Sequence, residues 1–150
     1  MRSLIRLAVA AGFAVAGSSL AFAQPAPSLP TKEGNYIIKN FKFSDGETLD
    51  TLRLHYTTLG TPVRDKSGRV TNAVLIMHGT GGSGHQFLRP QFSGVLFVPG
   101  GLLDIRKYYI ILPDDIGHGK SSKPSDGMRA SFPQYGYEDM VNAEHELVTK

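Results

Sequence analysis

The stretch that decides the fold is 73–82, AVLIMHGTGG, in which five apolar residues run directly into a histidine and a glycine-rich turn. An unbroken apolar run of this length is typical of a β-strand that is covered on both faces. A second run, 108–112 (YYIIL), ends at Pro113-Asp114-Asp115. Two buried strands about 30 residues apart predict a parallel sheet with crossover segments, and therefore an α/β fold.

Two further strands are predicted before this sheet. Residues 36–43 are rich in β-branched and aromatic side chains, and Asp45-Gly46 marks a turn after them. In the next segment apolar and polar residues alternate over 52–56 (LRLHY), which is the pattern of a half-buried strand. We expect the two strands to form an antiparallel pair, with 60–72 as a connecting loop.

The strongest helix signal lies near the end of the chain, at Tyr137–Thr149. Two acidic residues follow its first position, where they suit the positive end of a helix dipole. Its apolar residues fall near one face, as in an amphipathic helix. These residues are Tyr137, Met140, Val141, Leu147 and Val148.

The first 23 residues are expected to form a cleaved signal peptide. Arg2 and Arg6 give a positive start, and ten residues without a polar side chain follow at 7–16. The sequence AFA at 21–23 fits a signal-peptidase site. A spanning helix needs about 20 apolar residues, so a permanent membrane anchor is not expected.

The chain is predicted to have three parts: a signal peptide at 1–23, an extended linker at 24–34 and one globular domain at 35–150. The linker is predicted from three prolines within 24–30. Export would place the protein in the periplasm or outside the cell, where nucleotides and coenzyme A are scarce.

Composition excludes several classes of protein and site. The chain has 150 residues and no cysteine, which excludes a disulfide scaffold and a thiolate metal site. Sixteen Lys and Arg against 13 Asp and Glu give a formal charge of +3, too weak and too scattered to suggest a nucleic-acid partner. A hydrophobic content of 41% is too high for a disordered chain. We expect no membrane contact after signal cleavage, and the sequence does not indicate an oligomeric state.

The turn after the first buried strand is a candidate oxyanion hole. In 78–82 (HGTGG) the glycines allow backbone N–H groups to point at one spot, as the stabilisation of an oxyanion requires. The alternative is a tight turn between a strand and a helix, with no catalytic role.

Other motifs in the chain give weaker signals. Residues 79–84 spell G-x-G-x-x-G, but proline and glycine interrupt the segment that a dinucleotide site needs as a helix. The sequence GKS at 119–121 resembles the end of a phosphate-binding loop, but Asp114 stands where that loop needs glycine. Ser83 lies in a near match to the nucleophile elbow G-x-S-x-G, yet well inside a loop.

The remaining histidines suggest little chemistry. His118 with Asp114 and Asp115 could form a metal or acid–base site, although a loop of turn-forming residues is the simpler interpretation. His55 and His145 have no evident partner in the sequence, and we expect both at the surface. We expect no metal and no cofactor.

Several stretches along the chain match a known family in order and spacing. They are 43–49 (FSDGETL), 56–60 (YTTLG), 72–75 (NAVL), 113–119 (PDDIGHG), 121–127 (SSKPSDG) and 132–140 (FPQYGYEDM). Together they resemble the α/β-hydrolase superfamily, and more narrowly its homoserine O-acetyltransferase-like branch. The resemblance covers 35–149.

The resemblance implies the N-terminal half of an α/β-hydrolase fold, with an antiparallel strand pair that leads into a parallel sheet flanked by helices. It also implies a Ser-His-Asp enzyme that works through an acyl-enzyme. In this family the nucleophile follows the fifth strand, so the serine, acid and histidine are expected beyond Lys150. Thr80 alone is carried over, as an oxyanion-hole candidate through its backbone N–H, and His78 would shape its loop.

The activity implied for the parent protein is hydrolysis of a small-molecule ester or a related acyl substrate. Export removes the protein from acetyl-CoA and so favours transfer of the acyl group to water. The alternatives are an acyltransferase of the homoserine acetyltransferase type and a short non-catalytic binding module derived from the fold. The chain alone is expected to be inactive, with an exposed sheet edge.

Overall fold

The computed structural model describes residues 29–150, so the expected signal peptide at 1–23 lies outside the described residues. Four strands and two α-helices are joined by loops and 3₁₀ turns in this part of the chain. The elements are β1 (Thr31–Lys42), β2 (Thr48–Leu59), β3 (Ala73–Leu75), α1 (Pro90–Leu96), β4 (Tyr109–Pro113) and α2 (Tyr137–Thr149), with 3₁₀ turns at Gly84–Leu88, Pro124–Asp126 and Arg129–Ser131.

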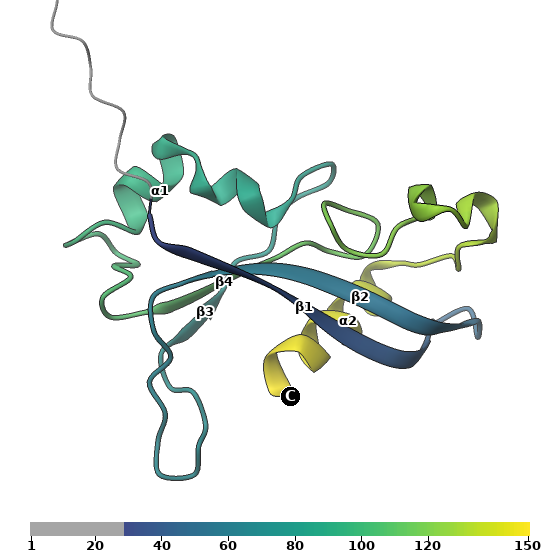
Figure 1. The fold of residues 1–150 in the computed structure, drawn as a ribbon, viewed down its shortest axis with the longest axis horizontal. Coiled ribbons are helices and arrows are strands. Elements are labelled where there is room, and N and C mark those ends of the chain that lie inside the picture. Colours follow the sequence, from purple (N-terminus) through teal and green to yellow (C-terminus); the bar gives the residue numbers. More distant parts are fainter. Residues whose placement is uncertain (1–28) are drawn as a thin grey trace, which may run out of the picture.

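The strands form one mixed sheet in the order β1-β2-β4-β3. β1 and β2 make a long antiparallel hairpin, and β4 continues the sheet antiparallel to β2. β3 pairs with β4 in parallel, with Ala73 opposite Tyr109 and Leu75 opposite Ile111. Both the predicted antiparallel pair and the predicted parallel pair are therefore confirmed, and Figure 1 shows the hairpin crossing the middle of the molecule.

β1 begins earlier than predicted. Its ladder starts with Thr31 opposite Leu59 and includes Gly34 opposite Tyr56. The predicted linker at 24–34 is therefore wrong from Thr31 onward. The side chains at the start of β1 are polar and exposed, so this part of the sequence has no apolar pattern from which a strand could be predicted. The strand is held there by backbone hydrogen bonds to β2.

Two apolar clusters hold the helices against the sheet. One cluster lies between the hairpin and α2, and the other lies where α1 covers β3 and β4. Figure 1 shows α2 behind the hairpin and α1 near the other end of the sheet. The fully or nearly buried members are Ile38, Phe41, Phe43, Leu52, Leu54, Ile116, Phe132 and Ala143 in the first cluster, and Leu59, Phe97, Ile110 and Leu112 in the second.

β3 is shorter and more exposed than the sequence predicted. Val74 and Ile76 pack against the second cluster, as a strand next to α1 requires. Leu75 and Met77 point to the opposite face and are 37% and 40% exposed. The prediction of a strand covered on both faces is therefore wrong for β3, because the described residues cover one face only.

The helix predicted at Tyr137–Thr149 is confirmed with those bounds. Its buried side differs from the predicted apolar face, because Ala143 and Glu144 are buried whereas Tyr137 and Val141 are 82% and 59% exposed. α2 thus rests on the hairpin and leaves much of its apolar side uncovered in the described part of the chain. No helix within residues 29–150 is long and apolar enough to cross a membrane.

Candidate functional site

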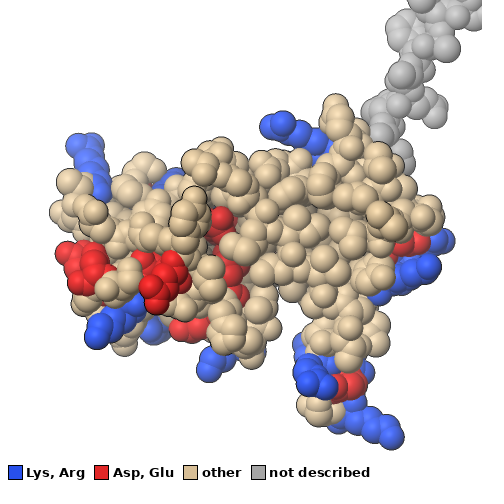
Figure 2. Space-filling model, turned by 180° about the vertical axis from the view of Figure 1, so that it is seen from behind, with Lys and Arg blue, Asp and Glu red and all other residues tan. Residues whose placement is uncertain are grey.

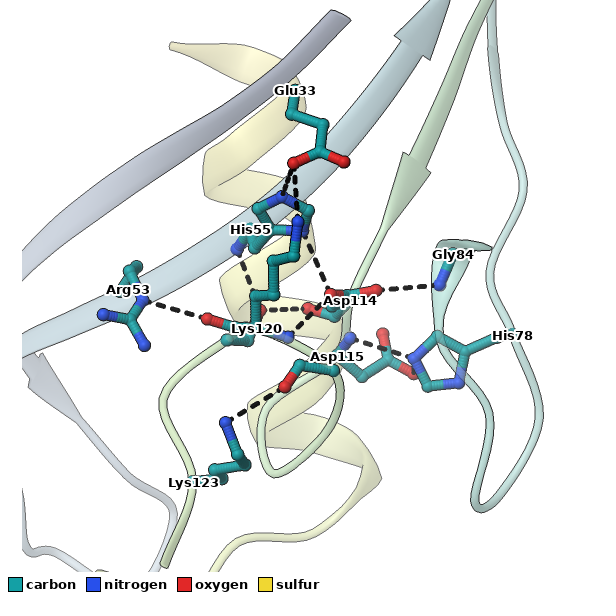
Figure 3. A network of polar contacts seen from close by, with 11 residues as sticks. Glu33, Arg53, His55, His78, Gly84, Asp114, Asp115, Lys120 and Lys123 are labelled. Atoms are coloured by element: carbon teal, nitrogen blue, oxygen red, sulfur yellow. Dashed lines mark hydrogen bonds and ion pairs between the residues drawn. The ribbon is translucent and has the colours of Figure 1, made fainter. Parts of the chain in front are cut away.

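The candidate site lies where the parallel strands β3 and β4 end. The loop after β3 carries His78 and Thr80, and the loop after β4 carries Asp114, Asp115 and His118. Carboxyl ends of parallel strands share one edge of a sheet, and ligands of open α/β sheets bind outside that edge. Figure 3 shows Asp114 and Asp115 beside His78 and Gly84, which come from the neighbouring loop.

The carboxylate of Asp114 joins three segments of the chain. Its Oδ1 accepts the N–H of Gly84 at 2.8 Å, and its Oδ2 accepts the N–H of Lys120 at 2.8 Å. The same Oδ2 lies 3.0 Å from Nδ1 of His55 on β2. Because Asp114 is buried, these contacts fix both loops to the hairpin.

His55 is buried, so the prediction of a surface position is wrong for this residue. Its Nε2 lies 3.4 Å from Oε2 of Glu33, which also pairs with Nζ of Lys120 at 2.6 Å. The alternation seen at 52–56 fails here because Asp114 and Ser121, on the loop after β4, pack against His55. His145 is exposed, as predicted.

Gly119 has a positive φ of +51°, and a Cβ at this position would overlap the carboxylate of Asp114. Only a glycine allows the backbone to turn this closely around Asp114. Ser121, two residues later, is fully buried and donates its hydroxyl to the carbonyl of Asp114 at 2.5 Å. The resemblance to a phosphate-binding loop is therefore only formal, because the serine is occupied and Lys120 pairs with Glu33.

A small cavity lies between the two loops and α2. Its volume is about 200 Å³, and Thr80 forms part of its wall. Within residues 29–150 no acceptor receives the N–H of Thr80 or that of Gly79, whereas the N–H groups of Gly81, Gly82 and Gly84 are bonded. The other lining residues are Met77, His78, Gly79, Asp115, His118, Tyr137, Met140 and Val141.

Two buried carboxyl groups lie close to each other here: Asp115 lines the cavity, and Glu144 of α2 faces Asp115. Apart from each other, Oδ1 of Asp115 and both oxygens of Glu144 have no hydrogen-bond partner in the described residues, and a proton on one carboxyl group can be shared with the other. Burial raises the pKa of Asp115, and burial together with the charge of Asp115 raises the pKa of Glu144 to about 8. The sequence did not indicate Glu144, because a charged residue inside an amphipathic helix normally faces solvent.

A larger and more open groove, of about 470 Å³, lies beside His55 and Lys120. Its cations are paired with acids, since Lys120 contacts Glu33 and Arg53 contacts Asp126 at 3.4 Å. The smaller cavity holds the candidate oxyanion donor and is therefore the better candidate for chemistry. In the described part of the chain, no group of three or more His, Asp or Glu side chains is arranged to hold a metal ion.

Comparison with known proteins finds homologues among acyltransferases. A probable acyltransferase from Methanothermobacter thermautotrophicus is 32% identical over 112 residues, which cover 74% of this chain and 34% of that protein. A homoserine O-acetyltransferase from Methanohalobium evestigatum is 33% identical over 117 residues, covering 69% and 23%. No protein-family model matches the chain. The chain spans about a third or less of the length of these curated relatives.

Solved structures of the same fold include a transferase and an ester hydrolase. An acetylester hydrolase from Corynebacterium glutamicum superposes with a TM-score of 0.62 at 27% identity, covering 78% of this chain and 32% of that chain. A homoserine O-acetyltransferase from Staphylococcus aureus gives 0.64 at 22% identity, covering 79% and 35%. The chain therefore has part of an α/β-hydrolase fold, and the predicted resemblance to homoserine O-acetyltransferases is confirmed.

Proposed function

We propose that the protein with this chain, an α/β-hydrolase-fold homologue of the homoserine O-acetyltransferases, hydrolyses a small-molecule ester through an acyl-enzyme. Within it, the loop after β3 would supply an oxyanion donor. The observation that carries this proposal is that Thr80 lines the cavity and that its backbone N–H has no acceptor within residues 29–150.

The surrounding contacts support Thr80 as the donor. The N–H of Gly84 is bound by Asp114, and the N–H of Gly82 by the carbonyl of Gly79 at 3.0 Å. These bonds hold the loop on both sides of Thr80 while leaving its own N–H free. A donor held in place before the reaction stabilises developing negative charge without a reorganisation cost.

The proposed chemistry needs a nucleophile that the resemblance expects beyond Lys150. A serine oxygen would attack the ester carbonyl carbon and pass its proton to a histidine, and the carbonyl oxygen would become the oxyanion that accepts the N–H of Thr80. Collapse of this intermediate would break the ester C–O bond and release the alcohol, which takes the proton. Water would then cleave the acyl-enzyme and release the acid.

The open face beside β3 supports a larger parent protein. β3 forms an edge of the described sheet, and Leu75, Met77 and Val141 are exposed next to it. Figure 2 shows the molecule from behind, with a broad area free of Lys and Arg between charged ends. Exposed apolar area and an unpaired strand edge are the features that a further strand would cover.

Acyl transfer to an alcohol such as homoserine is the second candidate, and the homologues favour it. The two activities share the acyl-enzyme and differ in whether water or an alcohol takes the acyl group. The expected signal peptide favours water, because coenzyme A thioesters are scarce outside the cytoplasm.

The test is hydrolysis of p-nitrophenyl acetate by the complete protein as its gene encodes it, with homoserine and acetyl-CoA as a parallel assay. Thr80→Pro removes the N–H and should lower kcat about 100-fold or more, whereas Thr80→Ala keeps the N–H and should stay within a few-fold. Unchanged unfolding midpoints would show that both variants are folded. Equal losses in the two variants, or hydrolysis by residues 1–150 alone, would overturn the proposal.

A further inference from the structure

Two imidazole rings, one on each loop of the candidate site, each accept a backbone N–H from the other loop. His78, on the loop after β3, accepts the N–H of Asp115 from the loop after β4 at 3.1 Å. His118, on the loop after β4, accepts the N–H of Gly81 from the loop after β3 at 3.4 Å. The rings also contact each other edge to face, with centroids 5.0 Å apart.

The partners of each ring fix where its proton lies. Nδ1 of His78 is 2.8 Å from the carbonyl of Gly79, and Nδ1 of His118 is 3.1 Å from the carbonyl of Ile116. A carbonyl only accepts, so each Nδ1 must carry the proton. A backbone N–H only donates, so each Nε2 must be unprotonated. Both rings are therefore neutral in this arrangement.

We propose that His78 and His118 are positioning residues that hold the N–H of Thr80 in the direction the oxyanion requires. Thr80 lies between His78 and Gly81, two of the points where the loop is tied to the loop after β4, and Gly84 is a third. The inference rests on the proposed function, because it assigns these rings to the oxyanion loop. It requires that Nε2 of each ring keeps accepting its backbone N–H during turnover.

Several titratable groups face the two rings. Oδ2 of Asp115 lies 3.7 Å from Nε2 of His78. Asp114 precedes it on the same loop, Glu144 faces Asp115 from α2, and Tyr137 lines the same cavity.

The test measures amide hydrogen exchange in the complete protein as its gene encodes it. His118→Ala should lower the protection of the Gly81 amide about tenfold and leave Asp115 within about threefold, and His78→Ala should give the reverse. His118→Gln offers an amide oxygen in place of Nε2 and should restore protection of Gly81. His85→Ala, an exposed position after the same loop, is the matched control and should change neither amide.

Ester hydrolysis and imidazole nitrogen shifts complete the test. His118→Ala should lower kcat about tenfold with little change in KM, and His118→Gln should recover it. The nitrogen shifts should place the proton on Nδ1 of both rings at pH 7. The inference would be overturned if either variant lost protection at both amides, or if neither amide lost protection. The proposed ester hydrolysis would not be affected by that result. The predicted exchange pattern without any hydrolysis would instead remove the proposed function and, with it, the positioning role.

Discussion

At the scale of single residues, the buried carboxyl group of Glu144 makes the stability of the fold depend on pH. Its pKa is raised from 4.5 to about 8, first by burial and then by the charge of Asp115. Between these values the folded chain holds a proton that the unfolded chain releases. The free energy of unfolding should therefore fall as the pH rises from 4.5 to 8, by up to about 1.4 kcal/mol per pH unit.

Glu144→Gln tests this coupling, because the amide is neutral at every pH. We expect the variant to be more stable than the wild type at pH 8 and to show a flatter profile between pH 5 and 8, as measured by urea unfolding. Glu138→Gln, an exposed position on the same helix, should keep the wild-type slope. An unchanged slope in Glu144→Gln would contradict the expectation.

Residue patterns predicted the loops of the site better than its buried polar contacts. His78, Thr80 and the glycines around them follow a buried strand in the sequence, so the loop could be recognised locally. His55 could not, because its partners Glu33 and Asp114 are 22 and 59 residues away. A pairing over such a distance leaves no local trace in a single sequence.

At the scale of elements, the start of α2 is tied to the turn of the hairpin. Asp139 accepts the N–H of Ser44 at 2.7 Å and its hydroxyl at 2.8 Å, and it also accepts the N–H of Gly136 at 2.9 Å. Burial alone would raise the pKa of Asp139, but these hydrogen bonds outweigh burial and lower it. The two matching stretches 43–49 and 132–140 thus meet in space.

A double-mutant cycle on Ser44 and Asp139 tests this tie. Asp139→Ala should cost about 2 kcal/mol, because it removes a helix cap and three partly buried hydrogen bonds. Ser44→Ala should cost about 1 kcal/mol, and the double variant should cost less than the sum by a similar amount. Denaturant unfolding measures all three.

Asp45→Ala is the matched control, because its carboxylate accepts only the nearby N–H of Glu47 at 2.8 Å within the described residues. Its cost should add to that of Asp139→Ala without coupling. Additivity between Ser44 and Asp139 themselves would show that the crossing hydrogen bonds do not stabilise α2.

Element positions were easier to predict than their faces. The bounds of α2 follow from helix-forming residues and acidic residues at its start, which are local properties. Which side it buries depends on the hairpin beneath it, and the sequence does not orient one against the other. The prediction that β3 is covered on both faces is wrong for the same reason. An apolar run predicts burial of both faces, but it does not show whether a neighbouring element covers Leu75 and Met77.

At the scale of the whole molecule, we expect the exported protein to begin at Gln24. The residues before it combine a positive start, an apolar segment and small residues at Ala21 and Ala23, which signal peptidase requires. Cleavage would remove Arg2 and Arg6 and no acid, so the formal charge of residues 24–150 would be 14 minus 13, or +1.

Mass spectrometry of the N-terminal peptide, from protein recovered outside the cytoplasm, measures this directly. Ala23→Arg should block cleavage, because a bulky charged side chain does not fit the small-residue site. The uncleaved protein should then be found in the membrane fraction of the cells. Ala26→Arg, three residues beyond the cut, should be processed normally. A mature protein that starts at Met1 in the cytoplasm would contradict export. It would also favour transfer to an alcohol over hydrolysis, because acetyl-CoA would then be available to the site.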